Sequence, residues 1–152
     1  MNQPIDPEKQ LQDGSHNDGQ EGLSDGIENI IWSDFWMHAR GETDIRFESH
    51  MKGRYGYNDT NVYIQTTEYC MLGPHGSYYR ANLGIKVMHG SYSFYLPSPD
   101  AMWQNRAWHN YEHYFWCRRS WSPQLIRLAI LTHFDGPNGG KAFWKEVGLT
   151  HI

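Results

Sequence analysis

Two histidines four residues apart, His109 and His113, with Glu112 between them, are the side chains of this sequence best suited to metal chemistry. On a helix, residues at positions i and i+4 share one face, so both imidazoles would reach the same zinc ion. Glu112 would then act as a third ligand or as a general base. One alternative hypothesis is therefore a zinc-dependent hydrolase. The simpler interpretation is the polar edge of an amphipathic helix, which needs no cofactor.

A second set of candidates combines aromatic rings with basic side chains. The run Lys52-Gly53-Arg54-Tyr55-Gly56-Tyr57 resembles the K/R-G-F/Y-G/A-F stretch of RRM and cold-shock RNA-binding sheets, with Arg54 as an extra residue. One extra residue turns every following side chain to the opposite face of a strand unless a bulge absorbs it. Further aromatic and basic residues suit contacts to a nucleic acid or a protein: Tyr79, Arg80, Trp116, Arg118 and Arg119.

The charges divide the chain into two parts. Residues 1–31 hold seven acids and one base, whereas the remaining residues hold 12 bases and 10 acids. Residues 1–23 are mostly polar and bury too little apolar surface to offset the entropy of ordering, so we expect a disordered acidic tail. A single globular domain should then occupy residues 24–152. Its weakly basic character does not favour nucleic-acid binding, because phosphate contacts need a stronger basic stripe.

The cysteine count and hydropathy restrict the cellular setting. Cys70 and Cys117 are the only cysteines, and no CxxC motif exists, so we expect two buried free thiols. The longest apolar run is too short to span a membrane, and the first residues lack the pattern of a signal peptide. We therefore predict a cytoplasmic or otherwise intracellular protein with no membrane partner.

Periodicity predicts an α+β fold. Helical spacing of apolar residues predicts a helix over about 25–39, and proline start signals predict helices over about 99–119 and from Pro123 to near Asp135. A short helix should follow over 141–147. Between them, alternation and turn residues predict strands at 44–49, 61–72, 78–88 and 92–96. Short loops favour an antiparallel meander of these four strands, with the three C-terminal helices packed on one face of the sheet.

The aromatic content gives the leading functional hypothesis. All 23 Trp, Tyr and Phe residues lie at or after Trp32, more than a core of this size can bury completely. No Walker A, GxGxxG or GxSxG motif is present, and no known family is recognised over a useful length. We therefore expect a non-enzymatic recognition or assembly protein without a cofactor, which binds a protein partner or forms a homo-oligomer through exposed aromatic and arginine side chains. Tyr55 and Tyr57 belong to this predicted binding set, together with the five aromatic and basic residues named with them above.

A carbohydrate-binding module with aromatic platforms is a further alternative. Such modules are usually secreted, and they lack the three helices predicted at the C-terminal end of this chain.

Overall fold

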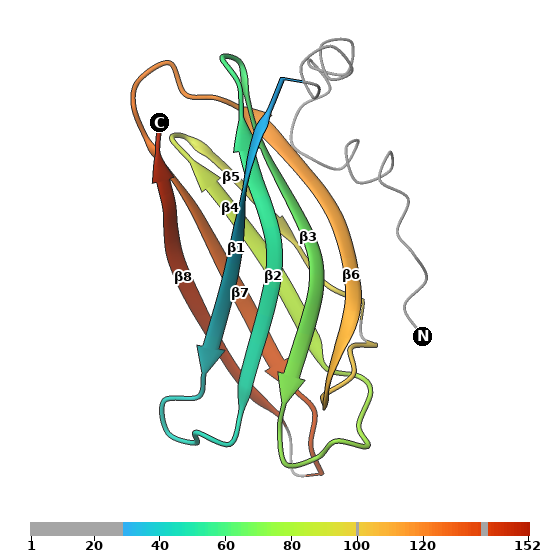
Figure 1. The fold of residues 1–152 in the computed structure, drawn as a ribbon. Coiled ribbons are helices and arrows are strands. Elements are labelled where there is room, and N and C mark those ends of the chain that lie inside the picture. The colour runs from blue at the N-terminus through green and yellow to red at the C-terminus, as the bar shows by residue number, and fades with distance from the viewer. Residues whose placement is uncertain (1–28, 100, 138–139) are drawn as a thin grey trace.

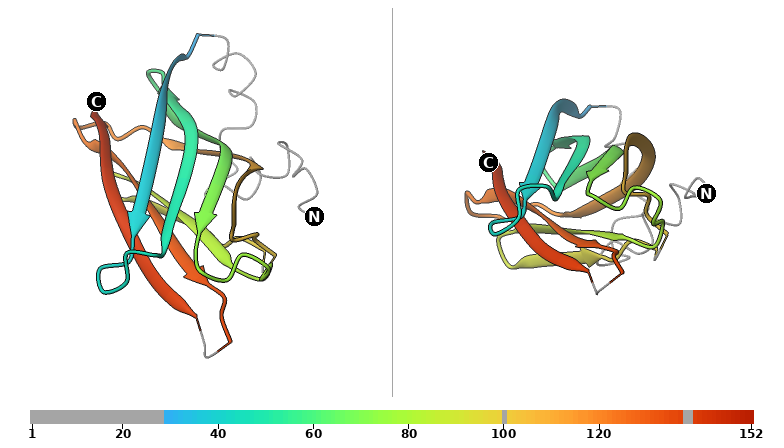
Figure 2. Two further views of the ribbon diagram at one scale, coloured as in Figure 1. Left: turned by 60° about the horizontal axis from the view of Figure 1, so that its bottom comes forward. Right: turned by 90° about the horizontal axis from the view of Figure 1, so that it is seen from below.

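The computed structural model describes residues 29–99, 101–137 and 140–152, and this part of the chain forms an all-β sandwich of two four-stranded antiparallel sheets (Figure 1). The two layers pack face to face, as seen from below in Figure 2. The strands are β1 (Ile31–Arg40), β2 (Glu48–Tyr57), β3 (Asn61–Leu72), β4 (Asn82–His89), β5 (Tyr92–Leu96), β6 (Asn105–Arg118), β7 (Leu125–Phe134) and β8 (Lys141–His151).

Sheet A has the order β1-β2-β3-β6, and sheet B has the order β5-β4-β7-β8. Hairpins join β1 to β2, β2 to β3, β4 to β5 and β7 to β8. The chain crosses between the layers after β3, after β5 and after β6. At the β4–β5 turn Gly90 has a φ of 58°, a left-handed conformation that glycine adopts without a steric penalty.

The core lies between the two sheets and follows the alternation of side chains along each strand. In β1 the inward positions are Phe35, Met37 and Ala39, and the residues between them are exposed. Two polar contacts cross the core. The Tyr111 hydroxyl of β6 donates to the Leu83 carbonyl of β4 at 2.9 Å. The hydroxyls of Ser49 and Thr132 lie 2.8 Å apart. Burial of these groups is compatible with stability because each has a partner.

The four predicted helices, and with them the α+β fold class, are wrong. Residues 29–39 of the first predicted helix, 25–39, are described, and they lead into and form most of β1. The segment 99–119 contains β6, Pro123–Asp135 contains β7, and 141–147 lies in β8. Because the aromatic residues of β6 occupy both faces of the strand, their spacing fits a helical stripe as well as alternation. β7 has apolar residues on both faces, and its short apolar run is equally ambiguous.

The strand predictions are right in part. The ranges 61–72 and 92–96 coincide with β3 and β5, and 78–88 overlaps β4. The predicted strand at 44–49 is a turn up to Phe47, where the Asp44 carboxylate binds the backbone and guanidinium of Arg46. The predicted single meander is wrong, because β4 and β5 belong to the second sheet. The predicted tail, residues 1–23, lies outside the described residues.

Two predictions about composition can be compared with the structure. Cys70 and Cys117 are both buried and free, as predicted. Burial raises the pKa of the Cys117 thiol to about 12. No helix in the described ranges is long and apolar enough to cross a membrane.

The buried histidine His113 should make the stability of the fold depend on pH. Desolvation lowers its pKa to about 4, whereas an unfolded histidine titrates near 6.5. The free energy of unfolding is therefore unaffected by His113 above about pH 6.5. It decreases by about 3 kcal/mol as the pH falls toward 4, because the unfolded chain then binds the proton more readily. We expect urea unfolding to report this loss between pH 6.5 and 4. His113→Phe should reduce the pH dependence, and His151→Gln, at an exposed position, should leave it unchanged. An equal pH dependence in His113→Phe would contradict the assignment.

Candidate functional site: the tryptophan face

The outer face of sheet A carries a concentration of tryptophan side chains, and we call it the tryptophan face. Its residues follow from the alternation and register of the four strands. β1 contributes Trp32, Asp34, Trp36, His38 and Arg40, and β2 contributes Glu48, His50, Lys52 and Arg54. β3 contributes Tyr63, Gln65, Glu68 and Cys70, and β6 contributes Trp108, Asn110, Glu112, Tyr114 and Trp116.

A lysine held against two indole rings forms the centre of this face. The Lys52 ammonium nitrogen lies 4.5 Å from the centroid of the Trp36 ring and 4.0 Å from that of Trp108. The two indoles themselves meet edge to face, with centroids 5.8 Å apart. Each cation–π contact contributes about 0.5–2 kcal/mol, depending on its desolvation. Lys52 thus fixes both rings on the sheet surface, where Trp36 is 62% and Trp108 38% exposed.

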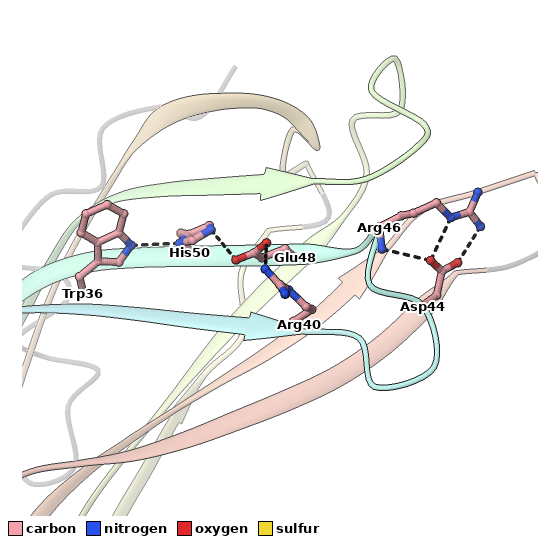
Figure 3. Close-up of polar contacts among 6 residues, drawn as sticks. All are labelled: Trp36, Arg40, Asp44, Arg46, Glu48 and His50. Atoms are coloured by element: carbon pink, nitrogen blue, oxygen red, sulfur yellow. Dashed lines mark hydrogen bonds and ion pairs between the residues drawn. The ribbon is translucent and has the colours of Figure 1, made fainter.

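A chain of hydrogen bonds further fixes Trp36 (Figure 3). The Trp36 indole N–H donates to His50 Nδ1 at 3.0 Å, and His50 Nε2 lies 3.1 Å from a Glu48 carboxylate oxygen. Arg40 donates to the other oxygen of Glu48, also at 3.1 Å. Because Nδ1 accepts, the neutral His50 carries its proton on Nε2 and donates it to Glu48. Burial lowers the pKa of His50, and Glu48 opposes that shift.

This histidine–carboxylate pair is not arranged for nucleophilic catalysis. The His50 nitrogen that would activate a nucleophile already accepts the proton of the Trp36 indole. The thiol of Cys70, opposite His50 in the neighbouring strand, is buried. Burial and the negative Glu48 raise the pKa of Cys70, which keeps it in the unreactive thiol form. The pair therefore positions an indole ring.

A recess of about 390 Å³ opens beside Trp36, above an irregularity in the β2–β3 pairing. Its lining residues are Asp34, Phe35, Trp36, Lys52, Gly53, Arg54 and Thr67. Thr67 falls between the paired positions and donates a hydrogen bond to the Lys52 carbonyl at 3.2 Å. The recess thus lies at the irregular pairing of β2 with β3, between Lys52 and Arg54.

On the other side of this recess the pattern of a cation on an indole is repeated. The Arg54 guanidinium lies 4.2 Å from the centroid of Trp32, and its Nε donates to the Gln65 side chain at 2.5 Å. At this end of the tryptophan face, Trp116 and Tyr63 form a small buried cluster with Ile30. The partly buried Trp32 packs against this cluster. The tryptophan face is therefore preformed at both ends.

The residues of the predicted binding set do not come together. Tyr55 packs against the core, and Trp116 is buried in the small cluster below Trp32. Arg119 stacks on Tyr57, with its guanidinium 5.2 Å from the ring centroid, at the β2–β3 turn beside the end of β6. Arg118 is exposed next to it. Tyr79 and Arg80 lie in the β3–β4 loop, at the opposite end of β3 and thus about 35 Å away.

The strand geometry also separates the predicted zinc ligands. His109 and His113 lie on the side of β6 that faces the core. Their Cα atoms are about 13 Å apart along the strand, because each strand residue advances about 3.3 Å. Glu112 is exposed on the opposite side of the strand. His109 stacks on Tyr69, with ring centroids 5.3 Å apart. In the described ranges, no group of three or more His, Cys, Asp or Glu side chains is placed to hold a metal ion.

Sequence reasoning missed Trp36, His50 and Trp108, and it considered Lys52 only as the start of the run from Lys52 to Tyr57. The available signal was the alternation of Trp36 and His38 with Phe35, Met37 and Ala39 in the sequence. The cross-strand partners depend on the register, which pairs Trp36 with Lys52 and His38 with His50.

Two other cavities lack a comparable arrangement. A groove of about 980 Å³ between the edges of β1 and β8 is lined by charges of both signs, including the Arg127–Glu146 ion pair. A mostly apolar depression of about 390 Å³ on the outer face of sheet B lies between Tyr95 and Trp144. Neither cavity contains a lysine or arginine stacked on an indole.

Fold and site together define an antiparallel β-sandwich with a preformed aromatic and cationic surface. Comparisons with protein-family models, curated proteins and solved structures give no match to this chain.

Gly53 should be required for the close packing of β2 against Phe35 and β3. A Cβ at this position would lie 2.6 Å from the Phe35 ring and in collision with the Gln65 carbonyl. We expect Gly53→Ala to destabilise the fold by about 2–3 kcal/mol in denaturant unfolding, because the colliding atom belongs to the backbone. Gly76→Ala is a matched control, since its Cβ would meet only ordinary contacts at 3.6 and 3.8 Å. Equal stabilities of the two variants would contradict this account.

Protonation of His50 should release the Trp36 indole. A proton on Nδ1 would face the indole N–H and abolish the hydrogen bond, and because the pKa is lowered, the midpoint should fall below 6.5. Charged groups nearby are Glu48, which opposes the shift, and Arg40 and His38, which add to it. We expect the indole N–H resonance of Trp36 to move in this range by NMR, while that of Trp144 stays fixed. In His50→Gln the movement should vanish, and a midpoint above 6.5 would contradict the arrangement.

Proposed function

We propose that this protein is a non-enzymatic recognition domain that binds a protein partner through the tryptophan face, with Trp36 as the anchor. The observation that carries the proposal is an indole that is 62% exposed yet held by His50 on its N–H and by Lys52 on its ring. A large apolar side chain that is fixed at the surface exposes hydrophobic area to water. This exposed area does not contribute to the stability of the monomer. That area becomes stabilising when a partner covers it.

The rigidity of the anchor supports binding in particular. Ordering a flexible side chain at an interface costs about 0.5–1.5 kcal/mol, and this cost is already met for Trp36 and Trp108 in the free protein. Tryptophan and arginine are the residues that most often dominate interface energies. Polar and charged side chains surround the indoles, as in the rim of a protein interface: Asp34, Arg54, Gln65, Glu68 and Asn110.

The charge pattern favours a protein partner over a nucleic acid. Acidic and basic side chains alternate on the tryptophan face, where Lys52 pairs across the strands with Glu68 and Arg54 with Asp34. A polyanionic backbone would meet both signs and would release few counterions. A protein surface with complementary charges fits this mosaic. We also propose that the domain lies inside the cell. Its two cysteines are buried free thiols, which supports a reducing compartment.

Replacement of the anchor should weaken binding selectively. Peptides selected from a random display library on the full-length chain should bind Trp36→Ala at least tenfold more weakly than wild type, measured by isothermal titration. Tenfold corresponds to about 1.4 kcal/mol, a modest loss for a buried interface tryptophan. The matched controls are Trp144→Ala on sheet B, where the indole is 66% exposed, and Trp121→Ala in a loop, where it is 97% exposed. Both should bind as wild type does.

Two results would count against this proposal. One is binding that survives in Trp36→Ala but is lost in Trp144→Ala, which would move the interface to sheet B. The other is the failure of repeated selections to yield any peptide. Sedimentation of the wild type and Trp36→Ala tests the related hypothesis of self-association, which predicts a wild-type oligomer that dissociates in the variant.

A further inference from the structure

We infer that a second copy of this chain pairs with the open edge of β1, antiparallel and related by a two-fold axis at Met37. The contact is made by the edge of the strand, so this inference does not rest on the proposed function. β1 is an edge strand of sheet A (Figure 1), and among the described strands it pairs with β2 alone. A strand edge presents unpaired backbone N–H and C=O groups, which form a template for another strand.

The hydrogen bonds of the β1–β2 turn show which backbone groups of β1 face this edge. The Gly41 amide donates to the Phe47 carbonyl at 2.9 Å, and this pair continues the β1–β2 register. Bonded and non-bonded pairs alternate along an antiparallel ladder, so the odd-numbered residues of β1 bond to β2. The even-numbered residues therefore direct their N–H and C=O groups away from β2. These residues are Trp32, Asp34, Trp36, His38 and Arg40.

The other three edge strands each have a feature that hinders further pairing. β5 has only five residues, and Pro97 and Pro99 follow it. β6 carries an extra residue at two places in its pairing with β3, and at the second of them Arg106 has a φ of 68°. β8 places Lys145 on its core side, opposite the buried Ile130. Prolines, bulges and inward charges protect sheet edges from association, and β1 has none of them.

The sequence of β1 is complementary to itself in one antiparallel register. With the two-fold axis at Met37, Asp34 lies opposite Arg40 of the second copy, and Trp36 lies opposite its His38. Each pair occurs twice because the interface is symmetric. Opposite charges and aromatic pairs at directly facing positions stabilise a sheet. Moving the axis by one residue in either direction separates Asp34 from Arg40, so charge complementarity selects this register.

The backbone favours the same register. It pairs the even-numbered residues from Asp34 to Arg40 with one another, and these are the residues whose polar groups face the edge. Their pairing forms about eight backbone hydrogen bonds. On the core side, Phe35 lies opposite Ala39, so a large side chain meets a small one. The groove of about 980 Å³ beside His38 and Arg40 leaves space along this edge.

Both charged residues are available for the contact between copies. Asp34 is exposed and makes no ion pair within the described ranges. Arg40 donates to Glu48 through one nitrogen, and its guanidinium has further N–H donors. The dimer joins the two A sheets into one continuous sheet. It places a Trp36 from each copy on the same side of that sheet, close to the two-fold axis.

Charge reversal tests this register on the full-length chain by sedimentation velocity over a concentration series. We expect the wild type to form a dimer that dissociates on dilution. Asp34→Arg and Arg40→Asp each place like charges opposite one another twice, so each alone should raise the dimer dissociation constant at least tenfold. A mixture of the two variants restores both pairs of opposite charges and should form a heterodimer. Glu112→Arg, at an exposed position of β6 on the other edge of sheet A, is the matched control and should dimerise as the wild type does.

Amide hydrogen exchange, measured by NMR, locates the interface on the strand. Raising the protein concentration should slow exchange at the Trp36 and His38 amides, because these N–H groups become bonded to the second copy. The Phe35 and Met37 amides should change much less, since they are already bonded to β2 in the monomer.

Four results would overturn this inference. The wild type could remain a monomer at every concentration, or the mixed variants could fail to associate. A dimer that persists in both single variants would place the contact elsewhere, and one that is lost only in Glu112→Arg would move it to β6. Association through the tryptophan face would leave the exchange of the edge-facing amides unchanged. The binding of selected peptides is measured separately, so failure of the dimer leaves the proposed function standing.

Discussion

The alternation of side chains along a strand determines where each ring of this chain can lie. A sandwich covers one face of each sheet, so every strand places half of its side chains in the core and half outside. In β1 this rule buries Phe35 and Met37 and places Trp36 and His38 outside. In β6 it buries Tyr111 and Phe115 and places Trp108 on the outer face. Rings at both odd and even positions therefore cannot all be buried by this fold.

The same property explains which elements could be predicted from the sequence. β3 and β5 were predicted correctly because turn residues bound them on both sides and their residues favour strands. β1, β6 and β7 carry apolar or aromatic residues on both faces, which weakens the contrast between inside and outside in the sequence. Spacings of three and four residues then occur by chance. Pro99 and Pro123 lie in irregular segments between strands. The hydroxyl of Ser98 accepts a hydrogen bond from the Leu83 amide rather than capping a helix.

The candidate site was less predictable than the fold because it depends on pairing between strands. The stretch from Lys52 to Tyr57 drew attention through its tyrosines, but Tyr55 turns to the core while Lys52 and Arg54 face outward. Which aromatic ring each cation meets is decided by the register of β1 on β2 and of β3 on β6. No local pattern specifies that register. The prediction of exposed aromatic rings came from counting them, and counting does not say which rings are exposed.

The described ranges contain no helix, and this changes the weight of one alternative. A carbohydrate-binding module was disfavoured partly because three C-terminal helices were expected, and that objection no longer holds. The distinction between a sugar and a peptide now depends on the aromatic surface itself. A sugar ring stacks best on an indole whose face is open, whereas Lys52 occupies one face of both Trp36 and Trp108. The ammonium between the rings leaves their edges and outer faces for contact, and it adds a positive charge that a neutral sugar does not use. The lysine that orders the tryptophan face therefore also occupies the ring surface on which a neutral sugar would stack.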